Sequence, residues 1–191
     1  HPAAAPGTRN RLVAQSVAET AAAVYRSMPF HDWVELRAAT TEIELGVRRP
    51  DAKDLKAAQE ILAKANGKPL TTLAEIYANE TVHLAERPPT VSSILQALRI
   101  GELGIVAVPC EVFAEIGLRL KKESPLRPTF TIELANGYNG YLPTPEQHAL
   151  GGYETWRARS SYLETGASPK IEAEVLKLLR TVAGKEDARG A

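Results

Sequence analysis

The sequence has only one cysteine, Cys110, and no excess of charge of either sign. A single cysteine excludes an intrachain disulfide framework and a cysteine-rich zinc module. Lysine plus arginine (23) equals aspartate plus glutamate (23), so the basic stripe typical of a nucleic-acid-binding protein is missing and no nucleic-acid partner is expected. No apolar run approaches the ~18 residues that a membrane-spanning helix needs, so we expect no transmembrane segment.

Histidines are also scarce and widely separated. Besides His1 the chain has His31, His83 and His148, which form neither an H-x-H nor an HExxH pattern. The sequence therefore offers no obvious pair of histidine metal ligands. Because it starts at His1 rather than at a methionine, we expect the true N-terminus and any export signal to be missing or removed.

What remains has the composition of an ordinary globular domain. The chain has 191 residues, of which 44% are hydrophobic and 24% are charged. This length is sufficient for one domain with a hydrophobic core. We expect a single α/β region over residues 1–191, with frayed ends at residues 1–8 and 184–191.

Apolar residues at helical spacing and local stop signals predict five helices. Asn66-Gly67 ends one of them, and Thr72 with Glu75 forms a capping box at the start of the next. The predicted helices cover residues 9–27 (amphipathic), 51–65, 72 to about 84, 112–120 and 169–182.

Strand patterns lie between these helices. Near-alternation over residues 33–47 predicts two strands or one long bent strand. Residues 94–100 and 103–108 flank Gly101-Glu102, which suits a type II′ hairpin turn. Residues 103–108 are apolar at almost every position, which predicts a strand covered on both faces, and residues 130–134 predict another short buried strand. The mixture predicts an α/β fold with a mixed β-sheet layered with helices.

The first candidate site is Val108-Pro109-Cys110-Glu111, where a buried strand ends. Strand ends in α/β sheets face the crevices in which ligands bind, so the Glu111 carboxylate is a candidate ligand. Alternatively, Glu111 lies in the first turn of the next helix and interacts with the helix dipole. Cys110 is either a nucleophile or, more commonly for a lone thiol, a small buried hydrophobic residue.

The second candidate site is the loop over residues 136–145, which carries Tyr138 and Tyr141 and is followed by Gly152-Tyr153. Its glycines let the backbone turn sharply, so that both tyrosines can point inward from a loop held by prolines. The alternative is an ordinary surface loop whose tyrosines pack over the edge of the core. Spacing by itself does not separate these two interpretations.

The order of these segments resembles that in the neutral (non-lysosomal) ceramidases. In that family a strand hairpin leads to a V-P-G-E turn, then an N-x-Y-x-x-Y segment and then a Y-E pair. Here the corresponding segments are the turn ending at Glu111, the segment from Asn136 to Tyr141, and Tyr153-Glu154. The resemblance covers roughly residues 95–163, and Cys110 stands where the family has glycine.

This resemblance implies a zinc amidohydrolase that cleaves ceramide into a long-chain base and a fatty acid. Glu111 and Tyr141 would be zinc ligands, Tyr153 would donate a hydrogen bond to the oxyanion, and Tyr138 would contact the substrate. Zinc accepts carboxylate and phenolate oxygens alongside imidazole. In the family two histidines complete the site.

The resemblance also implies that this chain is the C-terminal part of a larger catalytic domain, secreted or periplasmic, whose missing N-terminal half supplies the two histidines. A ceramide-like lipid is the expected substrate. Two other functions stay open at this point. One is a non-catalytic α/β domain that binds a partner or scaffolds an assembly, and the other is a hydrolase of the same scaffold that acts on a different amide or ester.

Overall fold

The computed structural model describes residues 7–184, and the chain divides into two compact units at Val34. The first unit contains helix α1 (Thr8–Ser27), which confirms the helix predicted over residues 9–27. Among the described residues of this unit none of the α1 side chains is buried, and the apolar Leu12, Val17 and Val24 are more than half exposed. The sequence suggested one α/β region over residues 1–191. The structure instead places α1 in a compact unit of its own, in which none of its side chains is buried. The ends predicted to be frayed lie almost entirely outside the described residues.

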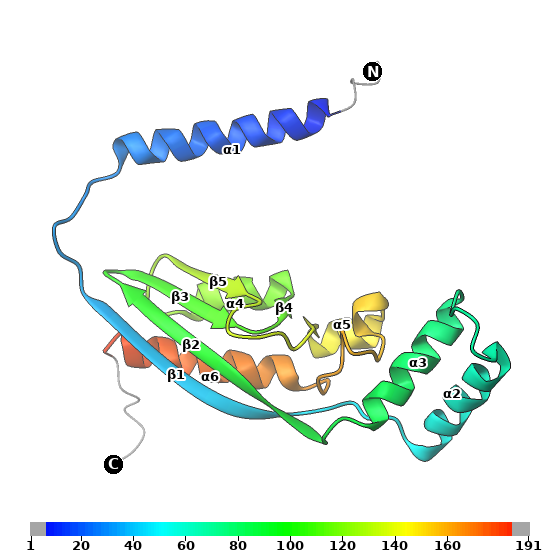
Figure 1. Cartoon of the computed structure of the whole chain (residues 1–191). Helices are drawn as coiled ribbons and strands as arrows, with labels where there is room; N and C mark the ends of the chain where they lie inside the picture. Colours follow the sequence, from blue (N-terminus) through cyan, green and yellow to red (C-terminus); the bar gives the residue numbers. More distant parts are fainter. Residues whose placement is uncertain (1–6, 185–191) are drawn as a thin grey trace, which may run out of the picture. The chain divides into compact units, whose positions relative to one another are not determined.

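The second unit is built on a four-stranded mixed sheet, which confirms the predicted fold class (Figure 1). The strand order is β1 (Leu36–Gly46), β2 (Thr90–Ile100), β3 (Leu103–Val108) and β5 (Thr129–Glu133). The first three strands pair antiparallel, whereas β3 and β5 pair parallel. Residues 33–47 contain one strand rather than two. Between β2 and β3, Gly101 has φ 58, the positive value that the first turn position requires, so the predicted hairpin is confirmed.

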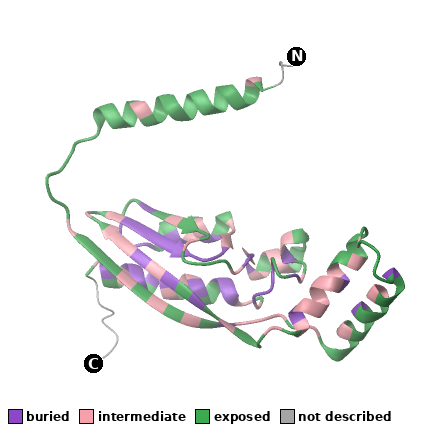
Figure 2. Cartoon of the chain, in the orientation of Figure 1, coloured by how far each residue is buried: buried purple, intermediate pink, exposed green. Residues whose placement is uncertain are grey.

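Helix α6 (Ala167–Val182) packs along one face of this sheet and forms the main core with it. Figure 2 shows the buried residues concentrated in β2, β3 and α6. Every residue of β3 after Leu103 is buried, as its apolar sequence predicted. The fully buried side chains at this interface include Leu95, Val106, Ile171, Val175 and Leu179.

The opposite face of the sheet carries exposed apolar side chains together with polar ones such as Thr40 and Gln96. Phe130 and Ile132 of β5 are 40% and 43% exposed, so the prediction of a buried strand over residues 130–134 is wrong. The reason is that β5 is an edge strand. Phe130 and Ile132 are the register partners of Ile105 and Ala107. Because side chains alternate between the two faces of a strand, Phe130 and Ile132 lie on the same face, opposite α6. Ile94 and Ile100 of β2 are also exposed, at 42% each.

The remaining helices lie between the strands. Helices α2 (Ala52–Ala65) and α3 (Leu73–Ala85) pack on each other and connect β1 to β2. The predicted stop at Asn66 and the predicted capping box of Thr72 and Glu75 are both confirmed. Two short helical segments precede α6, namely α5 (Pro145–Leu150) and the 3-10 helix η1 (Tyr153–Thr155). None of the helices within residues 7–184 is long and apolar enough to cross a membrane.

Helix α4 (Ala114–Glu123) starts two residues later than predicted. The reason is that Glu111–Val112 form a short strand, β4, which pairs parallel with β6 (Tyr141–Leu142). Glu111 therefore precedes the helix and is not in its first turn. Glu115 is the acidic residue of that first turn.

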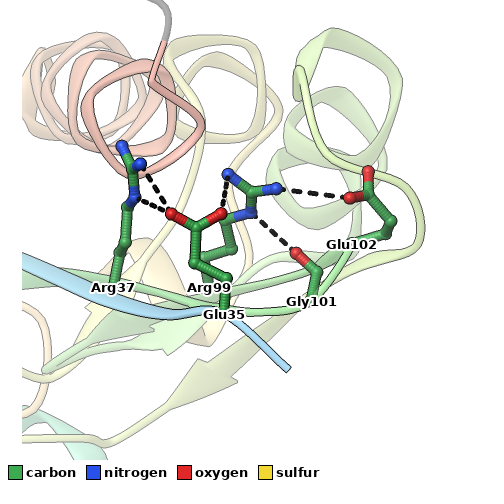
Figure 3. A network of polar contacts seen from close by, with 5 residues as sticks. All are labelled: Glu35, Arg37, Arg99, Gly101 and Glu102. Carbon is green, nitrogen blue, oxygen red and sulfur yellow. Dashed lines mark hydrogen bonds and ion pairs between the residues drawn. The ribbon is translucent and has the colours of Figure 1, made fainter. Parts of the chain in front are cut away.

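A polar network joins the start of β1 to the β2–β3 hairpin (Figure 3). The Arg99 side chain, only 14% exposed, forms ion pairs with Glu35 at 3.3 Å and Glu102 at 3.2 Å. Its Nε donates to the carbonyl oxygen of Gly101 at 2.7 Å, and the Gly101 N–H donates to the Glu35 carbonyl at 2.8 Å. The network thereby fixes the end of the hairpin against β1.

We expect Arg99→Met to lower the free energy of unfolding by about 1–2 kcal/mol, because it keeps most of the aliphatic stem and removes the half-buried charged hydrogen bonds. Urea denaturation is the measurement. Glu102→Gln is the matched control, because the Glu102 side chain is 79% exposed and its ion pair should contribute less than about 0.5 kcal/mol. Equal losses in both variants would contradict a special contribution from Arg99.

Candidate active site

Pairing between β4 and β6 brings Glu111 and Tyr141 side by side. The two residues are register partners in a parallel pair, so their side chains point to the same face. The Glu111 N–H donates to the carbonyl oxygen of Gly140 at 2.9 Å, and the Tyr141 N–H donates to that of Ser160 at 2.8 Å. Both residues that the resemblance assigns to zinc are thus placed by backbone hydrogen bonds.

The other two predicted site residues lie in the same place. The Tyr138 hydroxyl is 3.4 Å from Glu111 Oε1, a long hydrogen bond. The hydroxyl oxygens of Tyr141 and Tyr153 are 2.7 Å apart, and their rings meet edge to face with centroids 5.6 Å apart. We call these four residues the Glu111 cluster. Tyr138 and Tyr153 are each 55% exposed, so the cluster opens to solvent.

Asn139 anchors the loop that carries the cluster tyrosines. Its N–H donates to the Pro109 carbonyl oxygen at 2.6 Å, and its side-chain amide donates to Ser93 Oγ at 3.1 Å. The amide oxygen accepts from the hydroxyl of the buried Tyr162 at 2.6 Å. This role of Asn139 was not predicted from the sequence. The feature that could have indicated it is an amide side chain between two tyrosines in a glycine-rich loop.

Gly140 makes the close crossing of chain segments possible. Its φ of +75 lies in the left-handed region that favours glycine. A Cβ at this position would overlap the carbonyl group of Ser160. The same carbonyl accepts the hydrogen bond from Tyr141, so only a residue without a side chain allows β6 to approach this closely.

The electrostatic environment raises the pKa of Tyr138 and of Tyr141. The pKa of Tyr141 is raised well above its ordinary value, chiefly by the hydrogen bond with Tyr153, then by burial and by the negative charge of Glu111. Burial is the main cause of the raised pKa of Tyr138, and Glu111 adds to it. Without a nearby cation these phenols are neutral hydrogen-bond donors at pH 7. A bound cation would offset the Glu111 charge and favour ionisation of Tyr141.

Cys110 takes no part in this cluster. It is fully buried and belongs to the hydrophobic core, and burial raises the pKa of its thiol to about 12. A thiol in this environment is not ionised at neutral pH and is a poor nucleophile. The interpretation of Cys110 as a small buried hydrophobic residue is confirmed, and its neighbour Glu111 is the partly exposed one of the two.

The donor types of the Glu111 cluster suit zinc, but the described residues supply only part of a site. Zinc sites usually have four ligands, of which three or four come from protein. Within residues 7–184 no group of three or more histidine, cysteine, aspartate or glutamate side chains could hold a metal ion. Glu111 and Tyr141 are therefore two candidate donors that need further ligands from elsewhere.

A groove lies beside the cluster and was not predicted from the sequence. Its volume is about 390 Å³, and Tyr138 of the cluster forms part of its wall. Ile76, Tyr77 and Glu80 of α3 contribute another part, and residues 158–160 contribute the rest. The sequence predicted α3 as a capped helix but not its contribution to the groove, because the residues of a helix do not indicate which distant loop the helix will contact.

Comparison with known proteins supports the resemblance at the level of the fold. A scan of protein-family models and a search of curated proteins gave no match. The crystal structure of neutral ceramidase from Pseudomonas aeruginosa is similar over 82% of this chain, with a TM-score of 0.50 and 17% sequence identity. A ceramidase complexed with C2 is similar over 55% of this chain, with a TM-score of 0.44 and 19% identity.

This chain covers 30% of the length of the first of these structures and 16% of the second. The likeness to the Pseudomonas aeruginosa structure rests on backbone geometry, because so few residues are identical. The mixed sheet with its helices thus has a ceramidase-like fold, as the order of motifs predicted.

Proposed function

We propose that this chain is part of a zinc-dependent amidohydrolase of the neutral ceramidase type, which hydrolyses the N-acyl amide of ceramide-like lipids. The observation that carries the proposal is the convergence of Glu111, Tyr138, Tyr141 and Tyr153 in one solvent-accessible cluster. These residues come from three segments of the chain. They are the residues that the ceramidase resemblance singles out, and the ceramidase-like fold is an independent support.

In this proposal Glu111 and Tyr141 hold the zinc ion together with two histidines from outside the chain. When bound, zinc supplies Lewis-acid chemistry that polarises the amide carbonyl. Glu111 would contribute a negatively charged oxygen ligand, and the phenol oxygen of Tyr141 would be the second ligand from this chain. Tyr153 would donate a hydrogen bond to the oxygen on which negative charge develops. Tyr138 contacts the substrate next to the reacting amide.

Two observations support the idea that another polypeptide region completes this site. The chain corresponds to less than a third of the Pseudomonas aeruginosa neutral ceramidase. In addition, the sheet face opposite α6 exposes large apolar side chains such as Phe130 and Ile132. Large exposed apolar side chains on one face of a sheet are typical of a surface that another part of a protein covers.

The proposal is tested by measuring zinc in this chain alone and in the longer polypeptide that includes its upstream region. After dialysis the longer protein should retain about one zinc ion per chain, whereas this chain alone should retain little, because two oxygen donors do not make a tight site. The longer protein should hydrolyse a short-chain N-acylsphingosine. If it holds no zinc and cleaves no amide, the proposal is wrong. If it cleaves simple N-acyl amines or esters but not N-acylsphingosine, the alternative of a different substrate is correct.

A further inference from the structure

The outer edge of the sheet, at β5, has no neighbouring strand in the part of the chain that the structure describes. On the inner side, the Gly104 N–H of β3 donates to the Pro128 carbonyl oxygen at 2.9 Å. Backbone groups of alternate residues point to the same side of a strand, so Phe130 and Ile132 also turn theirs toward β3. Thr131, between them, turns its N–H and C=O to the open edge. An open edge of this kind is a template for a further strand.

A second groove, which we call the β5 groove, shows that α4 leaves this edge uncovered. Its volume is about 320 Å³, and it lies between α4 and β5, with Thr131 in its lining. The Thr131 hydroxyl is buried and has no hydrogen-bond partner among the described residues. The Thr129 hydroxyl, on the same face of β5, is by contrast 2.7 Å from Ser124 Oγ. A buried hydroxyl without a partner costs free energy, so Thr131 marks an incomplete contact at the edge.

We propose that the β5 edge binds the β5 edge of a second copy of this chain, as an antiparallel pair centred on Thr131. A two-fold axis at this residue lets Thr131 of each copy exchange both backbone hydrogen bonds with the other, at a Cα separation of about 5.5 Å. The two Thr131 hydroxyls then lie opposite each other and can form a cross-strand hydrogen bond, which gives each buried hydroxyl its partner. The two four-stranded sheets become one continuous sheet.

The β5 sequence is self-complementary in this register. Phe130 of each copy lies opposite Ile132 of the other, in the closer type of antiparallel pair. Pairs of an aromatic and a β-branched side chain stabilise antiparallel strands, and both side chains are available, since Phe130 is 40% and Ile132 is 43% exposed. The strand also contains neither lysine nor proline, the residues that commonly keep edge strands apart.

Charges at the two ends of the β5 groove match as well. Helix α4 runs antiparallel to β5, because the Val112 N–H before α4 donates to Glu133 Oε2 at 2.9 Å, whereas Ser124 at the end of α4 contacts Thr129. The exposed Lys121 therefore lies at the Thr129 end of β5. The antiparallel register places Glu133 of the second copy opposite Thr129, and hence beside Lys121. The two-fold axis repeats this pairing, so the interface is complementary in charge.

Sedimentation velocity of this chain tests the proposal and needs neither zinc nor a substrate. We expect a monomer–dimer equilibrium between about 1 and 100 µM protein. Ile132→Lys puts a charge opposite Phe130 twice per dimer and should weaken dimerisation at least ~10-fold. Ile94→Lys is the matched control, because Ile94 is 42% exposed on the same sheet face but lies on β2, which β3 separates from β5. Its dimerisation should be unchanged.

A charge reversal tests the antiparallel arrangement. Lys121→Glu brings like charges together at both ends of the interface and should weaken dimerisation about 5-fold. Glu133→Lys, added in the same chain, should restore dimerisation, because each end again pairs opposite charges. Lys122→Glu is the control with the same change of charge, since Lys122 is exposed and lies outside the lining of the β5 groove.

Three results would overturn the proposal. A chain that stays monomeric at about 100 µM would leave the β5 edge to a strand of another polypeptide segment. A dimer that Ile132→Lys does not weaken would assemble through a different surface. A Lys121→Glu defect that Glu133→Lys does not restore would contradict the antiparallel register. Each result is independent of the proposed function, because the Glu111 cluster contains no residue of β5.

Discussion

Glu111→Gln is expected to abolish zinc retention and to lower amide hydrolysis at least ~100-fold in the polypeptide that carries the complete site. Glutamine keeps the shape of the side chain but loses the negative charge, and a neutral amide oxygen is a much weaker ligand than a carboxylate. The main-chain hydrogen bond from Glu111 to Gly140 does not depend on the side chain. The fold should therefore survive, and zinc content together with kcat/KM gives the measurement.

Glu115→Gln is the matched control, because it removes the same charge from the exposed first turn of α4. Its carboxylate accepts a hydrogen bond from Gln147 and takes no part in the Glu111 cluster. Tyr141→Phe should lower zinc retention in the same direction as Glu111→Gln, since it removes the second oxygen donor. Full zinc content and full activity in both Glu111→Gln and Tyr141→Phe would show that the assignment of the site is wrong.

Gly140→Ala is expected to destabilise the protein by about 3 kcal/mol or more. Alanine is strained at a φ of +75, and its Cβ would overlap the Ser160 carbonyl group. Relief of this overlap requires the backbone to move. That movement would weaken the hydrogen bonds of Tyr141 to Ser160 and of Glu111 to Gly140, which place the two candidate ligands.

The measurement is chemical denaturation of Gly140→Ala, with Gly117→Ala as the control. Gly117 lies within α4, and a Cβ there would meet no atom within 4 Å. Alanine has the higher helix propensity, so Gly117→Ala should be neutral or stabilising by up to about 1 kcal/mol. A Gly140→Ala protein as stable as the unsubstituted chain would contradict the close crossing at Ser160.

The elements with local signals were predicted well from sequence. The capping box at Thr72, the left-handed stop at Asn66 and the hairpin glycine Gly101 each act within a few residues, so their neighbours suffice to identify them. Edge position depends on the whole sheet. The apolar residues of β5 therefore suggested a buried strand, although Phe130 and Ile132 are exposed on the open face.

The candidate site divides in a similar way. The order of the ceramidase-like motifs identified the four residues that the structure brings together. Strands as short as β4 and β6 have no periodicity to detect, so the parallel register that joins Glu111 to Tyr141 was not predicted. Asn139 and Tyr77 act through partners that are far away in the sequence, Tyr162 and Trp156, and their roles become visible only in three dimensions.

The connection between β1 and β2 has a consequence for how the protein can diversify. Helices α2 and α3 form an excursion between two neighbouring strands whose ends, Gly46 and Thr90, still pair with each other. The α2–α3 segment can therefore change in length or sequence while β1 and β2 remain paired. Because α3 forms a wall of the groove beside the Glu111 cluster and the cluster itself lies on other segments, substitutions in α3 can reshape that groove without changing the residues proposed for chemistry.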